Sequence, residues 1–186
     1  MVGRSDPEFS MVNERLLHSG YAFDLYATTW VDASGEVFER DIVRHRGAVA
    51  VVPLTDDQEH VVLVRQFRTP LNARLLELPA GLRDVDGESE IDTARRELEE
   101  EVGCVAETIE HLITLVTAVG FADEAISIFL ARDLTWTSRR ADGEEERSMT
   151  VEMVPLVEVG AMIANGEITD AKTVAGLLLL LQKLNS

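Results

Sequence analysis

The stretch from Gly81 to Cys104 reads GLRDVDGESEIDTARRELEEEVGC and restricts the fold and chemistry more than any other part of the chain. Ser89, followed three residues later by Asp92, is typical of a helix N-cap, and Gly103 stands where a helix is expected to end. Between them, apolar residues recur at helical spacing and form one narrow stripe: Ile91, Ala94, Leu98 and Val102. The sequence therefore predicts a helix through this stretch.

Acidic side chains crowd the predicted helix. At about 100° per residue, Glu97 and Glu101 fall together on one flank of the apolar stripe, while Glu100 points further toward solvent. Like charges four residues apart destabilise a helix by roughly 0.2–0.5 kcal/mol per pair, so this pair is a cost unless a cation lies between the carboxylates. Magnesium or manganese, which prefer carboxylate oxygens, would fit. Arg96 and Glu100 are also four apart and are expected to form an ion pair.

Composition limits the class of protein. The chain has 186 residues, 46% of them hydrophobic, which suits one core with a small N-terminal extra layer. Its net charge of −17 and pI near 4.5 argue against binding to nucleic acids or acidic membranes. The single cysteine, Cys104, excludes an internal disulfide and suits a reducing compartment, for which we expect the cytoplasm. We interpret it as a small buried hydrophobe.

The remaining pattern predicts strands before and after the acidic helix. Residues 21–30 and 36–45 are expected to form a hairpin that turns at 32–35, and residues 47–54 and 60–67 a second one. Further strands are expected near 111–118, 126–131 and 149–156, and helices near 157–164 and 170–184. This mixed order favours an α/β sandwich.

The spacing of the residues from 81 to 104 resembles the signature of the Nudix hydrolases, G-x5-E-x7-R-E-U-x-E-E-x-G-U, where U is a bulky apolar residue. This chain has one extra residue before Glu88, in the loop outside the helix. The segments LLELPAGL from Leu75, GFADE from Gly120 and ITDAKTVAGLL from Ile168 resemble the ADP-ribose pyrophosphatase branch. One residue departs from that branch, since Val119 precedes Gly120 where proline is usual.

The resemblance implies a Nudix-type α/β/α sandwich with a mixed sheet and an N-terminal antiparallel β extension. It implies hydrolysis of ADP-ribose to AMP and ribose 5-phosphate with Mg or Mn, held by the carbonyl of Ala80 and by Glu97 and Glu101, with help from Glu100. Water activation is expected from an acidic loop, where Glu146 is the first choice and Glu145 the second.

The substrate contacts that the resemblance implies centre on Arg68, which is expected to bind a phosphate, with Arg44 as a weaker candidate. Glu77, Leu82 and Glu124 match positions near the substrate. The family also implies a homodimer, in which related enzymes exchange N-terminal elements. Two alternatives stay open: another nucleoside diphosphate sugar or a dinucleotide as substrate, and a non-catalytic ligand-sensing Nudix domain.

The chain is expected to divide into three parts. The first ten residues, MVGRSDPEFS, have no apolar signal-peptide core and are interpreted as a vector-derived tail, with Met11 as the natural start. Residues 11–46 are expected to form the N-terminal β region and residues 47–186 the hydrolase domain.

Overall fold

The computed structural model describes residues 6–139 and 148–186. Their contacts divide the chain into two compact units. The first comprises Met1–Gly47 with Val116–Ala125, and the second comprises Ala48–Leu115 with Ile126–Ser186. In the described part of the chain, no helix has the length and apolar character needed to cross a membrane.

The first unit contains a three-stranded antiparallel sheet in the order β1-β2-β3. Its strands are β1 (Phe9–Ser19), β2 (Phe23–Asp32) and β3 (Val37–His45). The predicted first hairpin is confirmed, and its turn depends on Gly35, whose φ of 87° favours glycine. Asp32 stabilises the turn by accepting hydrogen bonds from the backbone N–H groups of Ser34 and Glu36.

The second unit contains two sheets. One has the order β10-β5-β6 and the other the order β7-β4-β9-β8. The strands are β4 (Ala48–Pro53), β5 (His60–Arg68), β6 (Ala73–Glu77), β7 (Ala80–Leu82), β8 (Cys104–Val116), β9 (Ala125–Trp136) and β10 (Thr150–Pro155). Strand β4 pairs in parallel with β9 and antiparallel with β7, so this sheet is mixed, as predicted.

The prediction of a second hairpin is wrong. Strands β4 and β5 follow each other in the chain and are linked by a tight turn with a single bridge, Leu54 to Val61, but they belong to different sheets. All six residues of β4 are buried, and alternate residues face two separate cores. A continuous apolar run is typical of a central strand buried on both faces, and it does not identify the neighbouring strand.

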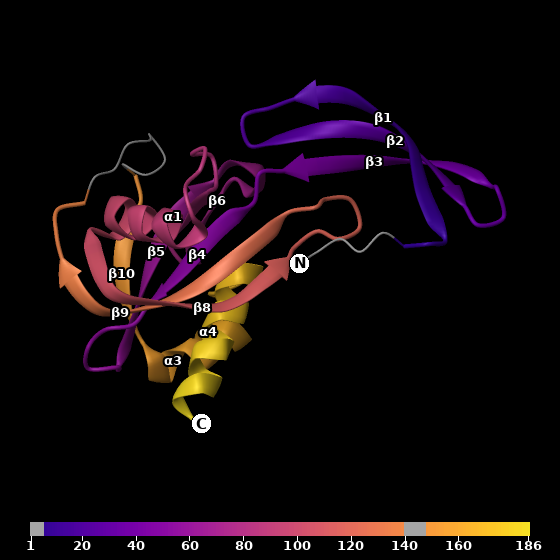
Figure 1. The fold of residues 1–186 in the computed structure, drawn as a ribbon. Coiled ribbons are helices and arrows are strands. Elements are labelled where there is room, and N and C mark those ends of the chain that lie inside the picture. The colour runs from indigo at the N-terminus through magenta and orange to yellow at the C-terminus, as the bar shows by residue number, and fades with distance from the viewer. Residues whose placement is uncertain (1–5, 140–147) are drawn as a thin grey trace. The chain divides into compact units, whose positions relative to one another are not determined.

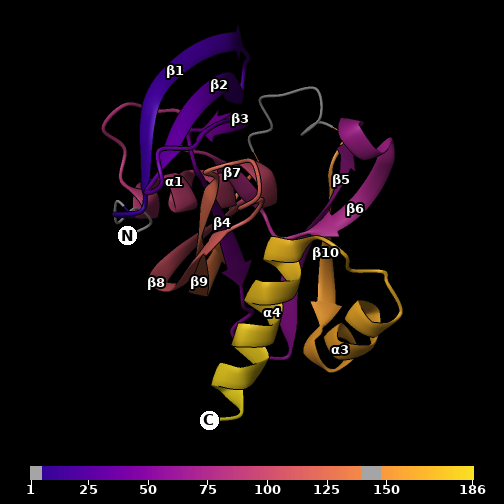
Figure 2. The same ribbon diagram turned by 90° about the vertical axis from the view of Figure 1, so that its right-hand side faces the viewer.

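Helices cover the second unit on two sides (Figure 1). Ala50 and Val52 of β4 pack in the core that includes α3 (Leu156–Ala164) and α4 (Ala171–Leu184), which lie beside β10 in Figure 2. Val49 and Val51 pack in the other core, with apolar residues of α1 (Glu90–Glu97) and of the π-helical turn η2 (Leu98–Val102). The second unit is therefore an α/β/α sandwich.

The helical run formed by α1 and η2 together begins and ends where the sequence predicts, although its second part, Leu98–Val102, is π-helical. Ser89 is the N-cap and accepts a hydrogen bond from the N–H of Asp92, and Gly103 ends η2 with a φ of 77°. The predicted apolar stripe is correct for Ala94, Leu98 and Val102 but not for Ile91, which is exposed. The Ile91 side chain therefore lies outside the core that buries the other three.

Candidate active site

The two carboxylates singled out in the signature helix reach one short strand. Glu101 Oε2 accepts a hydrogen bond of 2.9 Å from the backbone N–H of Ala80, the first residue of β7. The carboxyl group of Glu97 lies against the next residue, Gly81. Both glutamates are buried, with 7% and 4% of their surfaces exposed. Their side chains therefore meet the backbone at adjacent positions.

A side chain at position 81 would collide with the Glu97 carboxylate. A Cβ atom added there would lie 2.0 Å from Cδ and Oε1 of Glu97 and 2.4 Å from its Oε2. Non-bonded heavy atoms pack at about 3.5–4.0 Å, so any other residue at this position would displace the carboxylate. Gly81 is not among the residues of positive φ, which means that the backbone conformation alone does not demand glycine.

Arg96 contacts several neighbouring carboxylates. Its Nη1 lies 2.6 Å from Glu97 Oε1 and 3.1 Å from Glu100 Oε2, which confirms the predicted ion pair with Glu100. Its Nε and Nη2 lie 3.2 Å from the two oxygens of Glu88. Burial alone would lower the pKa of Arg96, but the hydrogen bonds that it donates to Glu88 and the charge of Glu97 raise it overall. Its Nη2 also lies 3.8 Å from Asp84 Oδ1, so one guanidinium faces four carboxylates and negative charge is in excess.

A second pair of charges lies at the ends of β5 and β6. Arg68 Nε and Nη2 donate to Glu77 Oε1 and Oε2 at 2.8 and 2.7 Å, a bidentate contact. Hydrogen bonding to Glu77 raises the pKa of Arg68. The Arg68 side chain remains 36% exposed, whereas that of Glu77 is 2% exposed. The guanidinium is therefore held on one edge while part of it faces solvent.

Two other predicted residues belong to the first unit. Arg44 on β3 forms ion pairs with Glu14 at 2.7 Å and with Asp123 at 3.1 Å. Glu124 accepts a short hydrogen bond from the hydroxyl of Thr117. Both side chains are engaged within their own unit.

The remaining predicted residues are Leu82, Glu145 and Glu146. Leu82 ends β7 and pairs with Ala48 of β4, in the same strand that carries Ala80. Glu145 and Glu146 lie within residues 140–147, outside the described residues.

Sequence reasoning assigned no role to the start of α4, where Lys172 is only 7% exposed. Its Nζ donates to Glu77 Oε2 at 2.5 Å and to Asp170 Oδ2 at 2.9 Å. The available signal was a lysine two residues after Asp170, at the start of a largely apolar helix and in a segment already matched to the family, ITDAKTVAGLL. A lysine in such a position is rarely buried unless it is paired.

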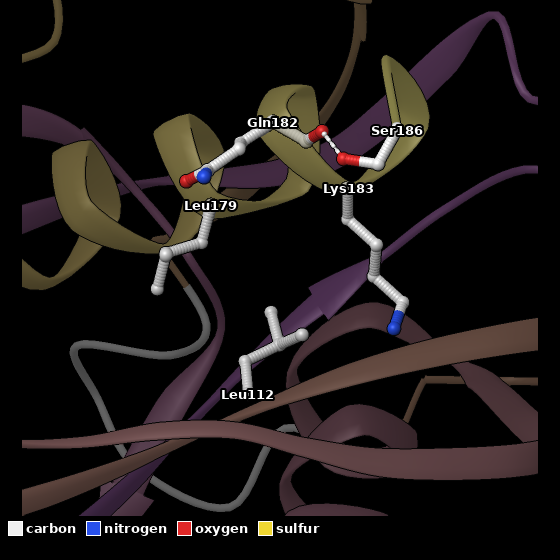
Figure 3. A pocket seen from close by; sticks show the side chains of 5 residues that line it. All are labelled: Leu112, Leu179, Gln182, Lys183 and Ser186. Carbon is white, nitrogen blue, oxygen red and sulfur yellow. Dashed lines mark hydrogen bonds between the residues drawn. The ribbon is translucent and has the colours of Figure 1, made fainter.

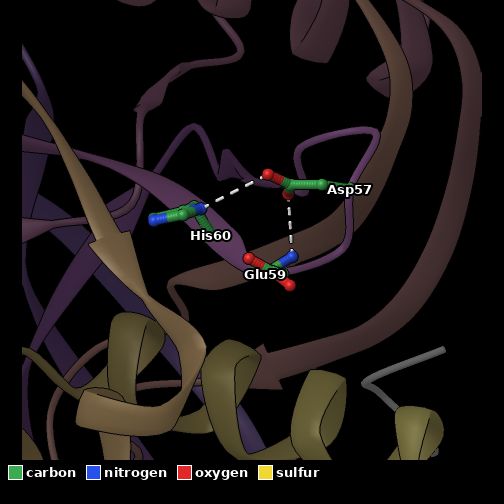
Figure 4. Close-up of side chains that lie close together, drawn as sticks. All are labelled: Asp57, Glu59 and His60. Carbon is green, nitrogen blue, oxygen red and sulfur yellow. Dashed lines mark hydrogen bonds and ion pairs between the residues drawn. The ribbon is translucent and has the colours of Figure 1, made fainter.

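Two other features of the second unit lie outside the charge clusters around Arg96 and Glu77. Asp57, Glu59 and His60 come close enough to hold a cation, but Asp57 and Glu59 are exposed and bond within their own turn (Figure 4). An open hollow of about 250 Å³ lies between β8 and the end of α4, lined by Leu112, Leu179, Gln182, Lys183 and Ser186 (Figure 3).

Cys104 is not suited to nucleophilic chemistry. The side chain is fully buried in the core beneath α1. Burial raises the pKa of the Cys104 thiol to about 12, so the thiolate is scarcely populated at neutral pH. Its interpretation as a packing residue is confirmed.

Comparison with known proteins places these features in a family. The family model described as the NUDIX domain matches residues 44–177, a span that includes the acidic helix, β7 and both charge clusters. The chain belongs to the Nudix family. The family prediction made from the spacing of Gly81 to Cys104 is therefore confirmed.

Relatives of this Nudix chain align with most of its length. It is 38% identical over 174 residues to an ADP-ribose pyrophosphatase of Mycobacterium tuberculosis, covering 94% of this chain and 84% of the relative. It is 36% identical over 166 residues to an ADP-ribose pyrophosphatase of Bacillus subtilis, covering 89% of each. The crystal structure of an ADP compounds hydrolase superposes with a TM-score of 0.82 at 26% identity, covering 98% of this chain and 97% of the other.

Gly81→Ala is expected to weaken binding of a divalent cation by at least roughly tenfold, the scale seen when a ligand loses its orientation. The physical reason is that the new methyl group would displace the Glu97 carboxylate. Manganese titration followed by electron paramagnetic resonance measures the affinity, and circular dichroism checks the fold.

The matched control is Gly160→Ala in α3, where an added Cβ meets no heavy atom of the described residues within 4 Å. This variant is expected to bind manganese as the parent does. An unchanged affinity in Gly81→Ala would show that the Glu97 carboxylate does not contribute to the cation site.

Proposed function

We propose that this Nudix hydrolase cleaves the diphosphate linkage of ADP-ribose, giving AMP and ribose 5-phosphate, with a divalent cation as cofactor. The observation that carries the proposal is the buried pair Glu97 and Glu101, whose carboxylates meet the backbone at Ala80 and Gly81. The two ADP-ribose pyrophosphatases that align with most of the chain support this choice of substrate.

The donor set fits magnesium or manganese. We propose that Glu97, Glu101 and the backbone carbonyl of Ala80 hold the cation, with help from Glu100. All of these donors are oxygens, which such cations prefer, and the cluster has an excess of negative charge. When bound, the cation supplies positive charge against the diphosphate oxygens and lowers the pKa of water. The N–H of Ala80 orients Glu101 by donating a hydrogen bond to its Oε2.

The protein's own side chains are proposed to bind the substrate and move the proton. Arg68 binds a phosphate group, because a guanidinium fixed on one edge still offers donors to oxygen atoms. From the family resemblance, we propose that Glu146, or else Glu145, accepts the proton of the attacking water. On the same basis the further residues near the substrate are Glu77, Leu82 and Glu124, with Arg44 as a weaker phosphate contact.

A panel of nucleoside diphosphate sugars and dinucleotides tests the substrate. With magnesium or manganese, ADP-ribose is expected to give the highest kcat/KM, and exhaustive chelation is expected to abolish turnover. Val119, which stands where proline is usual, favours a second candidate class of other nucleoside diphosphate sugars or dinucleotides. A higher kcat/KM for one of these would replace ADP-ribose, and binding without turnover would indicate a sensor.

Glu97→Gln and Glu101→Gln are each expected to remove several kcal/mol of transition-state stabilisation, the scale of lost metal catalysis. Both substitutions remove a charge from the proposed cation site but keep the size of the side chain. Glu99→Gln is the matched control and should change kcat/KM little, since the helical face places Glu99 away from the pair. Steady-state kinetics compares the three variants, and equal losses in all of them would contradict the assignment.

We further propose a homodimer that works in the cytoplasm. Large apolar side chains exposed on the first unit support an interface: Met11, Val12, Leu16, Leu17, Tyr21 and Phe23. Burial of such surface would stabilise an association between copies. Light scattering at micromolar concentration is expected to give the mass of a dimer, and a monomer would count against it. The cytoplasmic assignment is supported by the single, unpaired Cys104.

A further inference from the structure

The start of α4 carries a buried charge cluster that the proposed reaction leaves unexplained. Glu77 and Lys172 are 1% and 7% exposed, and they contact Arg68 and Asp170. All four residues belong to the second unit. Removing charged side chains from water is costly, and replacing a whole buried ion pair by well-packed apolar residues of similar volume is often no less stable. The cluster therefore calls for a role beyond packing.

Glu77 accepts hydrogen bonds from two positively charged side chains, Arg68 and Lys172. Its Oε2 accepts from Arg68 Nη2 at 2.7 Å and from Lys172 Nζ at 2.5 Å, while its Oε1 accepts from Arg68 Nε at 2.8 Å. Burial acts to raise the pKa of Glu77, but the hydrogen bonds of Arg68 and the charge of Lys172 lower it overall. Glu77 is therefore ionised at neutral pH, and its position depends on both partners.

Lys172 is itself held firmly. Asp170 accepts from Lys172 Nζ at 2.9 Å and, as the N-cap of α4, from the N–H and hydroxyl of Thr173 at 3.0 and 2.6 Å. The Thr173 hydroxyl in turn accepts from the backbone N–H of Leu78 at 2.9 Å. Because Leu78 follows Glu77 directly, this contact fixes the start of α4 to the strand end that carries Glu77.

The position of Glu77 determines which donors of Arg68 remain available to a ligand. Glu77 uses the Nε and Nη2 edge of the guanidinium, and within residues 6–139 and 148–186 no hydrogen bond engages Nη1. Without Lys172, Arg68 would face the carboxylates of Glu77 and Asp170 alone, and an incoming diphosphate would meet a local excess of negative charge. Glu77 would also lose the contact that fixes its Oε2.

We propose that Lys172 is a positioning residue that holds Glu77, so that Arg68 presents its Nη1 group to the diphosphate of the substrate. This inference rests on the proposed function, which assigns phosphate binding to Arg68. The C-terminal helix thereby takes part in substrate binding through a neighbour, without touching the substrate.

A double-mutant cycle tests the proposal, with Lys172→Met and Arg68→Met made singly and together. The readouts are the Kd of ADP, measured by calorimetry, and the KM and kcat for ADP-ribose. Each single variant is expected to raise Kd and KM by roughly tenfold, about the value of one good hydrogen bond to a charged group, and to change kcat less than about threefold. The double variant is expected to bind about as weakly as Arg68→Met alone.

Two results would overturn the proposal. One is multiplication of the single effects in the double variant, which would show that Lys172 acts independently of Arg68. The other is an unchanged Kd and KM in Lys172→Met with only a lower Tm, which would leave a purely structural role. If Lys172→Met does not fold, Lys172→Gln takes its place, because glutamine keeps a donor without the charge. A raised Kd in this variant would support the proposal, and an unchanged Kd would overturn it.

The two readouts separate this proposal from the proposed function. A parent protein that binds ADP without hydrolysing ADP-ribose would overturn the substrate assignment, and the Kd comparison would still decide the role of Lys172. A parent protein that binds no ADP would overturn both.

Discussion

The carboxylate of Glu97 occupies the space that a side chain at position 81 would fill, and this close approach depends on how the apolar core holds the helix against the strand. On one side, β7 is fixed because Gly81 pairs with Val49 of the buried strand β4. On the other side, α1 and η2 are fixed because Ala94 and Leu98 pack in the same core as Val49. Apolar burial thus sets the separation between helix and strand, and the acidic side chains are brought together within that limit.

The two groups of charged side chains in the second unit differ in their balance of charge. Around Arg96, several carboxylates share one guanidinium, so the group has an excess of negative charge and suits a cation. Around Glu77, two carboxylates are matched by Arg68 and Lys172. A balanced group can hold a guanidinium in place without neutralising it, and this suits an anionic ligand. The second unit therefore contains one group suited to each of the two charged species that diphosphate hydrolysis requires.

Local sequence predicted those parts of the structure whose causes are local. The helix from Ser89 to Gly103 was predictable because its N-cap, its apolar spacing and its terminal glycine lie within one stretch. The partners of β4 were not, because an apolar run specifies a buried strand and leaves its neighbours open. The contact between Lys172 and Glu77 joins residues 95 positions apart, so periodicity alone could not reveal it. Ile91 fitted the helical spacing, yet only the tertiary contacts show that it lies beyond the core.

The parallel pairing of β4 with β9 bears on the order in which the protein folds. A parallel pair requires a crossover, so the centre of this sheet cannot close during synthesis until β9 has left the ribosome. Glu101 and Ala80 are 21 residues apart, so their contact closes a much shorter loop of chain. Lys172 reaches Glu77 only after nearly the whole chain has been made. The proposed cation site therefore depends on nearby chain segments, whereas the group around Arg68 is completed by the last helix to be synthesised.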